Sequence, residues 1–145
     1  MSWQLFCYMA HHTLTGKICA FQKNLMSWKK YLGNEWETLA CQYLQGLGMQ
    51  IVARNWHFRH YELDIIAKQH GEIHVIEVKT RRSDQYIEIS DLVRRAQIER
   101  ILSATQAYVE TYHCTEPVLL DLLVIITNAA GTKFEFYPDA FHDSF

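Results

Sequence analysis

Two carboxylates and one lysine are spaced so that they could hold a divalent cation. Asp64 falls in the segment 62–67, and Glu77 and Lys79 fall in the segment 73–79. Both segments are predicted to be strands, in which alternate side chains share a face, so Glu77 and Lys79 point the same way. Carboxylate oxygens on rigid strands suit Mg²⁺ or Mn²⁺, and a lysine beside them can orient a water or stabilise charge on a phosphate oxygen. The alternative is a cross-strand Glu–Lys pair that serves stability alone.

The same alternation predicts how the first of these strands is oriented. Glu62 and Asp64 should face one way, and Leu63 and Ile65 should face the core. The polar loop 68–72 contains Gly71 and is short enough for a hairpin. Segments 62–67 and 73–79 should therefore be neighbours, with Asp64, Glu77 and Lys79 at one end of the sheet.

Hydrophobic periodicity predicts the other elements. Apolar residues recur at helical spacing over 32–47, and Gly46 and Gly48 end this helix, whose alternative start is as early as Ser27. The same spacing recurs over 91–112. Further strands are predicted at 49–56, 118–126 and 133–137. Because 118–126 is almost wholly apolar, it is typical of a central strand that is buried on both faces. The expected order is αβββαββ.

Length and composition exclude several classes of protein. The chain has 145 residues, of which 49% are hydrophobic and 21% charged, which fits one globular domain and excludes a disordered chain. No apolar run reaches the roughly 18–20 residues of a membrane-spanning helix. The net charge is −2, but residues 1–100 carry 13 Lys and Arg against 10 Asp and Glu. A polyanion should therefore meet that part of the chain.

The cysteines and the N-terminal segment bear on localisation and domain limits. The four cysteines show neither CxxC nor zinc-ligand spacing, so we expect reduced cysteines and a cytoplasmic protein. Residues 1–26 have neither the pattern of a secretory signal nor a clear periodicity. We expect them to be an extension outside the domain, with a misplaced translation start as one explanation, and a single domain over residues 27–145.

The order D-(x)12-E-x-K on two strands flanked by helices resembles the signature of the PD-(D/E)XK nuclease superfamily. A closer resemblance is to the YraN-like family, small bacterial proteins predicted to be endonucleases and related to archaeal Holliday-junction resolvases. It covers about residues 30–145. The motifs that carry it are Gly33-Asn-Glu-Trp-Glu37-Thr-Leu-Ala40 with Tyr43-Leu44, Arg54-Asn55-Trp56, Tyr61-Glu-Leu-Asp64-Ile-Ile66, Val75-Ile-Glu77-Val-Lys79-Thr-Arg81, Leu120-Asp121-Leu-Leu-Val124 and the ending Asp139-Ala140-Phe141.

This resemblance implies a restriction-endonuclease-like αβββαβ core with a mixed central sheet flanked by helices. It implies metal-dependent hydrolysis of phosphodiester bonds in DNA, on branched or structured substrates by relation to the resolvases, and a homodimer by the same relation. Asp64, Glu77 and the Val78 carbonyl would hold one or two Mg²⁺ or Mn²⁺ ions, and Lys79 would position the attacking water. Glu37 is a candidate ligand through water, with a solvated helix glutamate as the alternative.

Several other residues are assigned roles around this site. Glu62 is expected to support the ligands rather than bind the metal, and Gln97 either sits over the site from the second helix or faces solvent. Six arginines flank the site in sequence and are candidates for phosphate contacts, against the alternative of solvated surface residues. They are Arg54, Arg59, Arg81, Arg82, Arg94 and Arg95.

Asp121 and the histidines are predicted to lie outside the chemistry. Asp121 interrupts an apolar strand, and since a bare buried carboxylate is costly, we expect a hydrogen-bonded structural residue. Four histidines are scattered over loop and strand and are predicted to be surface residues, namely His57, His60, His70 and His74.

A second function stays open beside the nuclease. Trp36 and Tyr61 stand where the family has glycine, and Gln97 stands where it usually has lysine. None of these changes touches Asp64 or Glu77. The alternative is a nucleic-acid-binding module of the same fold with little or no cleavage activity, and a remoter third is a scaffold that binds a protein through the acidic C-terminal part.

Overall fold

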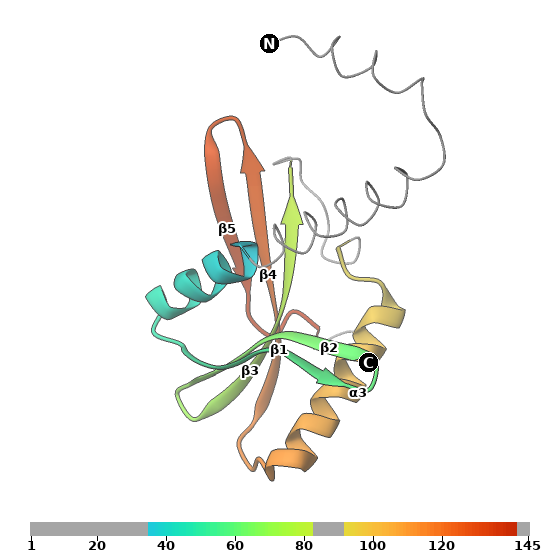
Figure 1. The fold of residues 1–145 in the computed structure, drawn as a ribbon. Coiled ribbons are helices and arrows are strands. Elements are labelled where there is room, and N and C mark those ends of the chain that lie inside the picture. Colours follow the sequence, from blue (N-terminus) through green and yellow to red (C-terminus); the bar gives the residue numbers. More distant parts are fainter. Residues whose placement is uncertain (1–34, 83–91, 142–145) are drawn as a thin grey trace, which may run out of the picture. The chain divides into compact units, whose positions relative to one another are not determined.

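The computed structural model describes residues 35–82 and 92–141, and Figure 1 shows their ribbon. A helix covers residues 35–46. The elements that follow are β1 (Gln50–Phe58), β2 (Tyr61–Gln69), β3 (Glu72–Arg81), α3 (Arg95–Tyr112), β4 (Val118–Asn128) and β5 (Gly131–Tyr137). The expectation for residues 1–26 lies outside the described residues. In the described part of the chain, no helix is long and apolar enough to cross a membrane.

The strands form one mixed sheet in sequence order, β1-β2-β3-β4-β5. Strands β1, β2 and β3 form an antiparallel meander, and β5 pairs antiparallel with β4. Strands β3 and β4 are parallel, which requires a crossover, and α3 lies in that connection. The expected restriction-endonuclease-like α/β class, with a mixed sheet between helices, is confirmed.

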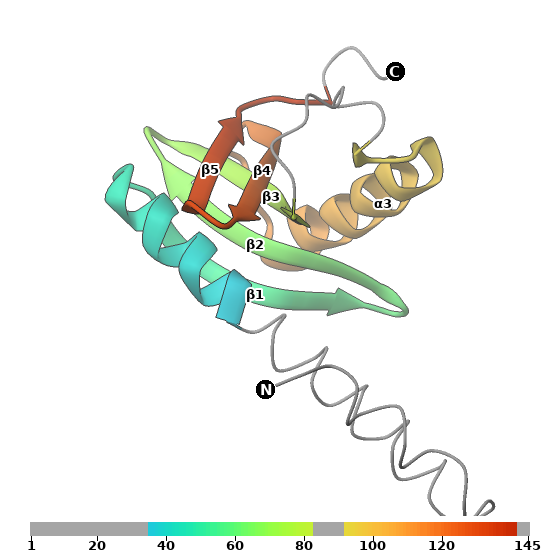
Figure 2. The same ribbon diagram turned by 90° about the horizontal axis from the view of Figure 1, so that it is seen from above.

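Each face of the sheet packs against one helix (Figure 2). On one face, Ile98, Ile101 and Tyr108 of α3 pack on apolar residues of β2, β3 and β4. On the other, Ala40 and Leu44 of the 35–46 helix pack on a second apolar cluster. Because β3 and β4 contribute to both clusters, their central residues are buried on both faces, as the apolar run of β4 predicted.

The loop at 68–72 is a tight hairpin, as expected. His70 and Gly71 have φ values of 52° and 82°, and they join Gln69 to Glu72, which are ladder partners. Two consecutive positive φ values are typical of a type I′ turn, whose twist matches that of the strands it joins. This turn sets the register in which β2 runs back along β3.

Strand alternation is interrupted where Asp64 lies. Leu63 and Ile66 are three residues apart, yet both belong to the cluster under α3, and Ala53 and Trp56 of β1 pack against that same cluster. Residues three apart on a regular strand face opposite ways. Asn55, between Ala53 and Trp56, has a φ of 48°, which reorients the chain at this point. Leu63 and Ile65 are buried as expected, but they pack in opposite clusters rather than on one core face.

Three predictions about single elements need correction. The strands are longer than predicted, because backbone pairing continues past their apolar residues into the turns. The helix predicted over 91–112 is interrupted, because Leu92 is helical but Val93 and Arg94 are not. Helix α3 therefore begins at Arg95. The prediction that His74 is a surface residue is wrong, since it is 5% exposed.

Candidate active site

Asp64 lies where β2 and β3 separate. The last pairs of their ladder run from Gln69–Glu72 to Ile65–Ile76. Beyond Ile65 the backbone of β2 no longer pairs with β3, and the Asp64 side chain takes its place. Asp64 Oδ2 accepts a hydrogen bond of 2.8 Å from the backbone N–H of Val78. This bond holds the Asp64 carboxylate beside the segment that carries Glu77 and Lys79.

Glu77 is held by two donors from different elements. Lys79 Nζ lies 2.8 Å from Glu77 Oε1, and the Glu77 side chain is 9% exposed. Gln97 Nε2, from the first turn of α3, donates to the same oxygen over 2.6 Å. The predicted shared face of Glu77 and Lys79 is therefore confirmed, and of the two positions weighed for Gln97 the structure has the one over the site.

Electrostatics couple the two carboxylates. Burial, followed by the negative charge of Glu77, raises the pKa of Asp64 to about 7. The Val78 N–H, Lys79 and, more weakly, Glu62 also act on this pKa, the first two lowering it and Glu62 raising it. An ionised Asp64 is thus costly unless a positive charge joins the pair.

The donor set fits a hard divalent cation. Mg²⁺ is usually held by one or two carboxylates together with waters, and Asp64 with Glu77 supplies that pair. Neither Asp64 Oδ1 nor Glu77 Oε2 has a hydrogen-bond partner among the residues that the structure describes. Within residues 35–82 and 92–141, no three His, Cys, Asp or Glu side chains gather closely enough to hold a metal. The described side chains therefore supply two carboxylates and no third acidic ligand beside them.

Glu37 and Glu62 are each engaged by a neighbour on β1. Glu37 Oε2 accepts a 2.8 Å hydrogen bond from Asn55 Nδ2 and lies 3.7 Å from Arg54 Nη2. Glu62 Oε1 lies 3.6 Å from His57 Nε2 at the solvent-exposed end of the hairpin. The charge of Glu62 thus raises the pKa of Asp64, but the Glu62 side chain pairs with His57. Glu37 is bonded to β1, the strand next to the one that carries Asp64.

No two of the six candidate arginines share a partner among the contacts of the described residues. Arg54 and Arg59 have intramolecular contacts, to Glu37 and Thr38 and over the Phe58 ring respectively. Arg95 is largely exposed and 3.6 Å from Glu99, and Arg82 and Arg94 are exposed. Arg81 is half-buried, and its Nε has no hydrogen-bond partner in the described structure. None of these contacts tests a role in binding phosphate.

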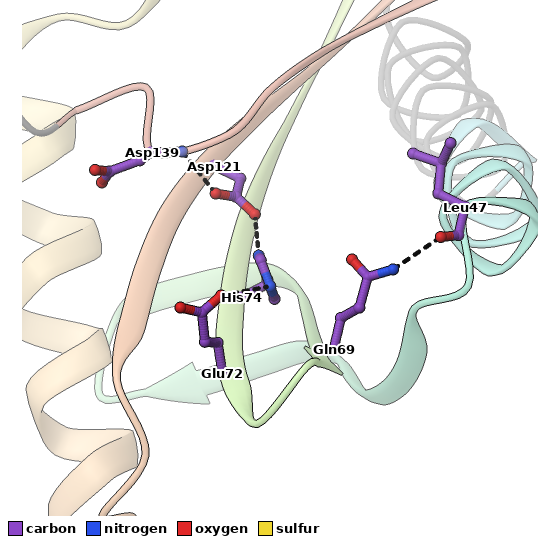
Figure 3. A network of polar contacts seen from close by, with 6 residues as sticks. All are labelled: Leu47, Gln69, Glu72, His74, Asp121 and Asp139. Carbon is purple, nitrogen blue, oxygen red and sulfur yellow. Dashed lines mark hydrogen bonds and ion pairs between the residues drawn. The ribbon is translucent and has the colours of Figure 1, made fainter.

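A buried polar pair lies elsewhere in the sheet (Figure 3). His74 Nδ1 is 2.7 Å from Asp121 Oδ2, and the backbone N–H of Asp139 donates to Asp121 Oδ1 over 2.9 Å. Asp121 is fully buried, so the prediction of a hydrogen-bonded structural carboxylate is confirmed. The sequence gives His74 only a weak signal, its position within the apolar run of β3, because the proximity of Asp121 comes from the parallel register of β3 and β4.

A mixed sheet between two helices, with an acidic pair and a lysine where two central strands separate, defines a restriction-endonuclease-like core. A family model described as uncharacterised protein family UPF0102 matches residues 36–126. The UPF0102 protein of Parabacteroides distasonis is 39% identical over 111 residues, covering 77% of this chain and 92% of that protein. That of Christiangramia forsetii is 37% identical over 110 residues, covering 76% and 92%. The chain belongs to the UPF0102 family, which is the YraN family that its motifs predicted.

Proposed function

We propose that this protein is a metal-dependent endonuclease that hydrolyses phosphodiester bonds in DNA. The observation that carries the proposal is the placement of Asp64, Glu77 and Lys79 at one point of the sheet. Asp64 is bonded to the Val78 amide, and Lys79 is 2.8 Å from Glu77. A desolvated pair of carboxylates with one lysine beside it is suited to bind Mg²⁺ or Mn²⁺ next to a phosphate.

The roles of the side chains follow from their contacts. Asp64, Glu77 and the Val78 carbonyl would hold the cation, which when bound supplies a water of lowered pKa and neutralises charge on the phosphate. Lys79 presents an ammonium beside Glu77, where it can stabilise negative charge that develops on the phosphate oxygens. Gln97 holds Glu77 from α3 and so limits its rotamers, which keeps the ligand in one orientation.

Substrate and assembly are proposed by family relation. Relation to the resolvases favours branched or structured DNA, and a two-fold homodimer would present two such sites to it. Exposed arginines such as Arg82 and Arg94 are available to contact phosphates. Cys41 and Cys114 are free, which is consistent with the proposed cytoplasmic location.

The test compares cleavage of three labelled DNAs, namely linear duplex, supercoiled plasmid and a four-way junction. Each is incubated with Mg²⁺, Mn²⁺ or a chelator. The wild type should cut at least one substrate with a divalent ion and none with the chelator, and Asp64→Asn should cut none. Glu135→Gln is the matched control, because Glu135 also pairs with a lysine on this sheet but lies on β5. Cleavage by Asp64→Asn equal to that of the wild type would contradict the proposed site.

One contact of Gln97 favours the second function, a nucleic-acid-binding module with little or no cleavage activity. Gln97, which replaces the usual family lysine, is neutral and uses its amide to bind Glu77, so the site has one cation fewer for phosphate. If the wild type retains DNA on a gel but cuts no substrate with any divalent ion, a binding module of the same fold is the better description.

A further inference from the structure

Asn55 occupies the position on β1 directly across from Asp64. Arg54 pairs with Ile65 and Trp56 pairs with Leu63, so the backbones of the intervening residues Asn55 and Asp64 lie at opposite positions of β1 and β2. Asn55 is therefore a close neighbour of the acid for which we propose a cation-binding role.

The backbone at Asn55 indicates a constrained position. Its φ of 48° lies in the left-handed region, which Asn and Gly tolerate better than other residues. Ala53 and Trp56 pack against the same cluster under α3 although they are three residues apart, so β1 rotates about its axis between them. The positive φ of Asn55 lies at this rotation. Asparagine is therefore suited to the backbone conformation at this position.

The two ends of the Asn55 amide are not equally used. Nδ2 donates to Glu37 Oε2 over 2.8 Å. Oδ1 is buried and has no hydrogen-bond partner within the described residues. Buried acceptors are nearly always satisfied, by protein groups or by an ordered water, so this oxygen requires an explanation.

Glu37, which accepts the hydrogen bond from Asn55, has a second carboxylate oxygen. The contacts of Glu37 with Asn55 and Arg54 both use Oε2. Glu37 Oε1 has no partner among the described side chains. An unpaired carboxylate oxygen and an unpaired amide oxygen are thus held together, on the strand next to Asp64.

We propose that Asn55 is a positioning residue that binds a water of the cation's hydration shell. Its Oδ1 accepts a hydrogen bond from that water, while its Nδ2 holds Glu37 so that Oε1 accepts from the same shell. The inference rests on the proposed function, because it needs the cation at Asp64 and Glu77. It gives Glu37 a role through water, although the described residues contain no cluster of three metal ligands. Glu37 acts through water, and Asn55 fixes where that water lies.

The test measures the affinity of the full chain for Mn²⁺ by calorimetry, without DNA. Asn55→Gly removes the amide and keeps a residue that adopts positive φ without strain. Its dissociation constant for Mn²⁺ should rise about three- to tenfold, the size expected for one lost hydrogen bond. Asn128→Gly is the matched control, since the Asn128 amide oxygen also accepts one hydrogen bond, in the β4–β5 turn. Its Mn²⁺ affinity should not change.

A double-mutant cycle separates positioning from general loss of structure. Glu37→Gln keeps an acceptor for the Asn55 amide but removes the charge. If both residues order the same shell, the effects of Asn55→Gly and Glu37→Gln on Mn²⁺ affinity should be less than additive in free energy. Water-proton relaxation at saturating Mn²⁺ should also differ between Asn55→Gly and the wild type, because bound water is held differently.

The outcomes distinguish the inference from the function on which it rests. Wild-type affinity and relaxation in Asn55→Gly, with binding lost in Asp64→Asn, would overturn the role of Asn55 and leave the cation site standing. Fully additive effects of the two substitutions would also overturn it. If the wild type does not bind Mn²⁺ at all, both the cation site and the role of Asn55 fall.

Discussion

His74 Nδ1 lies 2.7 Å from Asp121 Oδ2 in the interior of the sheet, on the two strands that run parallel. Asp121 Oδ1 accepts the backbone N–H of Asp139, which follows the last strand. One buried carboxylate therefore connects β3, β4 and the segment after β5. Phe141, two residues beyond Asp139, is 2% exposed in the apolar cluster under α3.

Asp121→Leu should lower the free energy of unfolding by roughly 3–5 kcal/mol, the cost of breaking a buried, hydrogen-bonded pair from one side. The substitution leaves the buried His74 ring without its hydrogen-bond partner and the Asp139 N–H without its acceptor. Urea denaturation measures the loss. Asp139→Asn is the control, because it retains the backbone donor that Asp121 uses. A loss below about 1 kcal/mol would contradict a structural role for Asp121.

Stability should depend on pH through the same carboxyl. Burial raises the pKa of Asp121, although the Asp139 N–H and His74 act to lower it. Because the pKa of Asp121 is raised in the folded state, the protonated Asp121 carboxyl contributes to the free energy of unfolding. This contribution is full below the ordinary pKa of 3.8 and is lost as pH rises through the raised pKa. Urea titrations at several pH values should show the wild type losing stability relative to Asp121→Asn over that range. A constant difference from pH 3 upward would contradict this assignment.

Asp64→Asn should stabilise the protein in chelator at pH 8. The pKa of Asp64 is raised to about 7, so the wild type loses stability as pH rises through 7, and the neutral amide does not. The gain should be on the order of 1–3 kcal/mol and should fade below the ordinary pKa of Asp64, and added Mg²⁺ should favour the wild type. Glu135→Gln is the control. Lys133 lowers the pKa of Glu135, so removal of the Glu135 charge should not stabilise the protein.

Lys79 should matter for cleavage much more than for binding. Lys79→Ala removes the ammonium beside Glu77. In the proposed reaction this ammonium would act on charge that develops in the transition state, and loss of one such group typically costs about 10²–10³ in rate. Loss of one phosphate contact weakens binding modestly and reduces the salt slope by about one. Nicking assays and gel retention measure the two effects. Lys133→Ala, which breaks the Lys–Glu pair on β5, should leave both unchanged. Equal nicking by Lys79→Ala and the wild type would remove Lys79 from the reaction.

The candidate site was predictable to the extent that strand alternation controls it. Glu77 and Lys79 are two residues apart on β3, and their shared face follows from the pleat alone. The hairpin at His70 and Gly71 has a clear turn signal, so the adjacency of β2 and β3 also followed. Asp64 needed more, because the ladder ends beside it and the chain reorients at Asn55, whose positive φ no local pattern in the sequence reveals.

His74 shows why other features were not predictable. It stands in a run of β3 that is buried on both faces, where periodicity cannot tell a core position from a surface one. Its partner Asp121 is 47 residues away, and only the parallel register of β3 and β4 brings the two together. Similarly, the break before α3 reflects backbone geometry at Val93 and Arg94, in a segment whose helical pattern continues.

The tight turn at His70 and Gly71 also has a kinetic consequence. Asp64 and Val78 are 14 residues apart, so the acidic pair belongs to a single local hairpin, while His74 and Asp121 require a closed loop of 47. Local loops close faster and at lower entropic cost. The two carboxylates should thus meet early in folding, before the crossover strand docks, and their repulsion would slow that step. A divalent ion that joins them would then accelerate folding more than it retards unfolding.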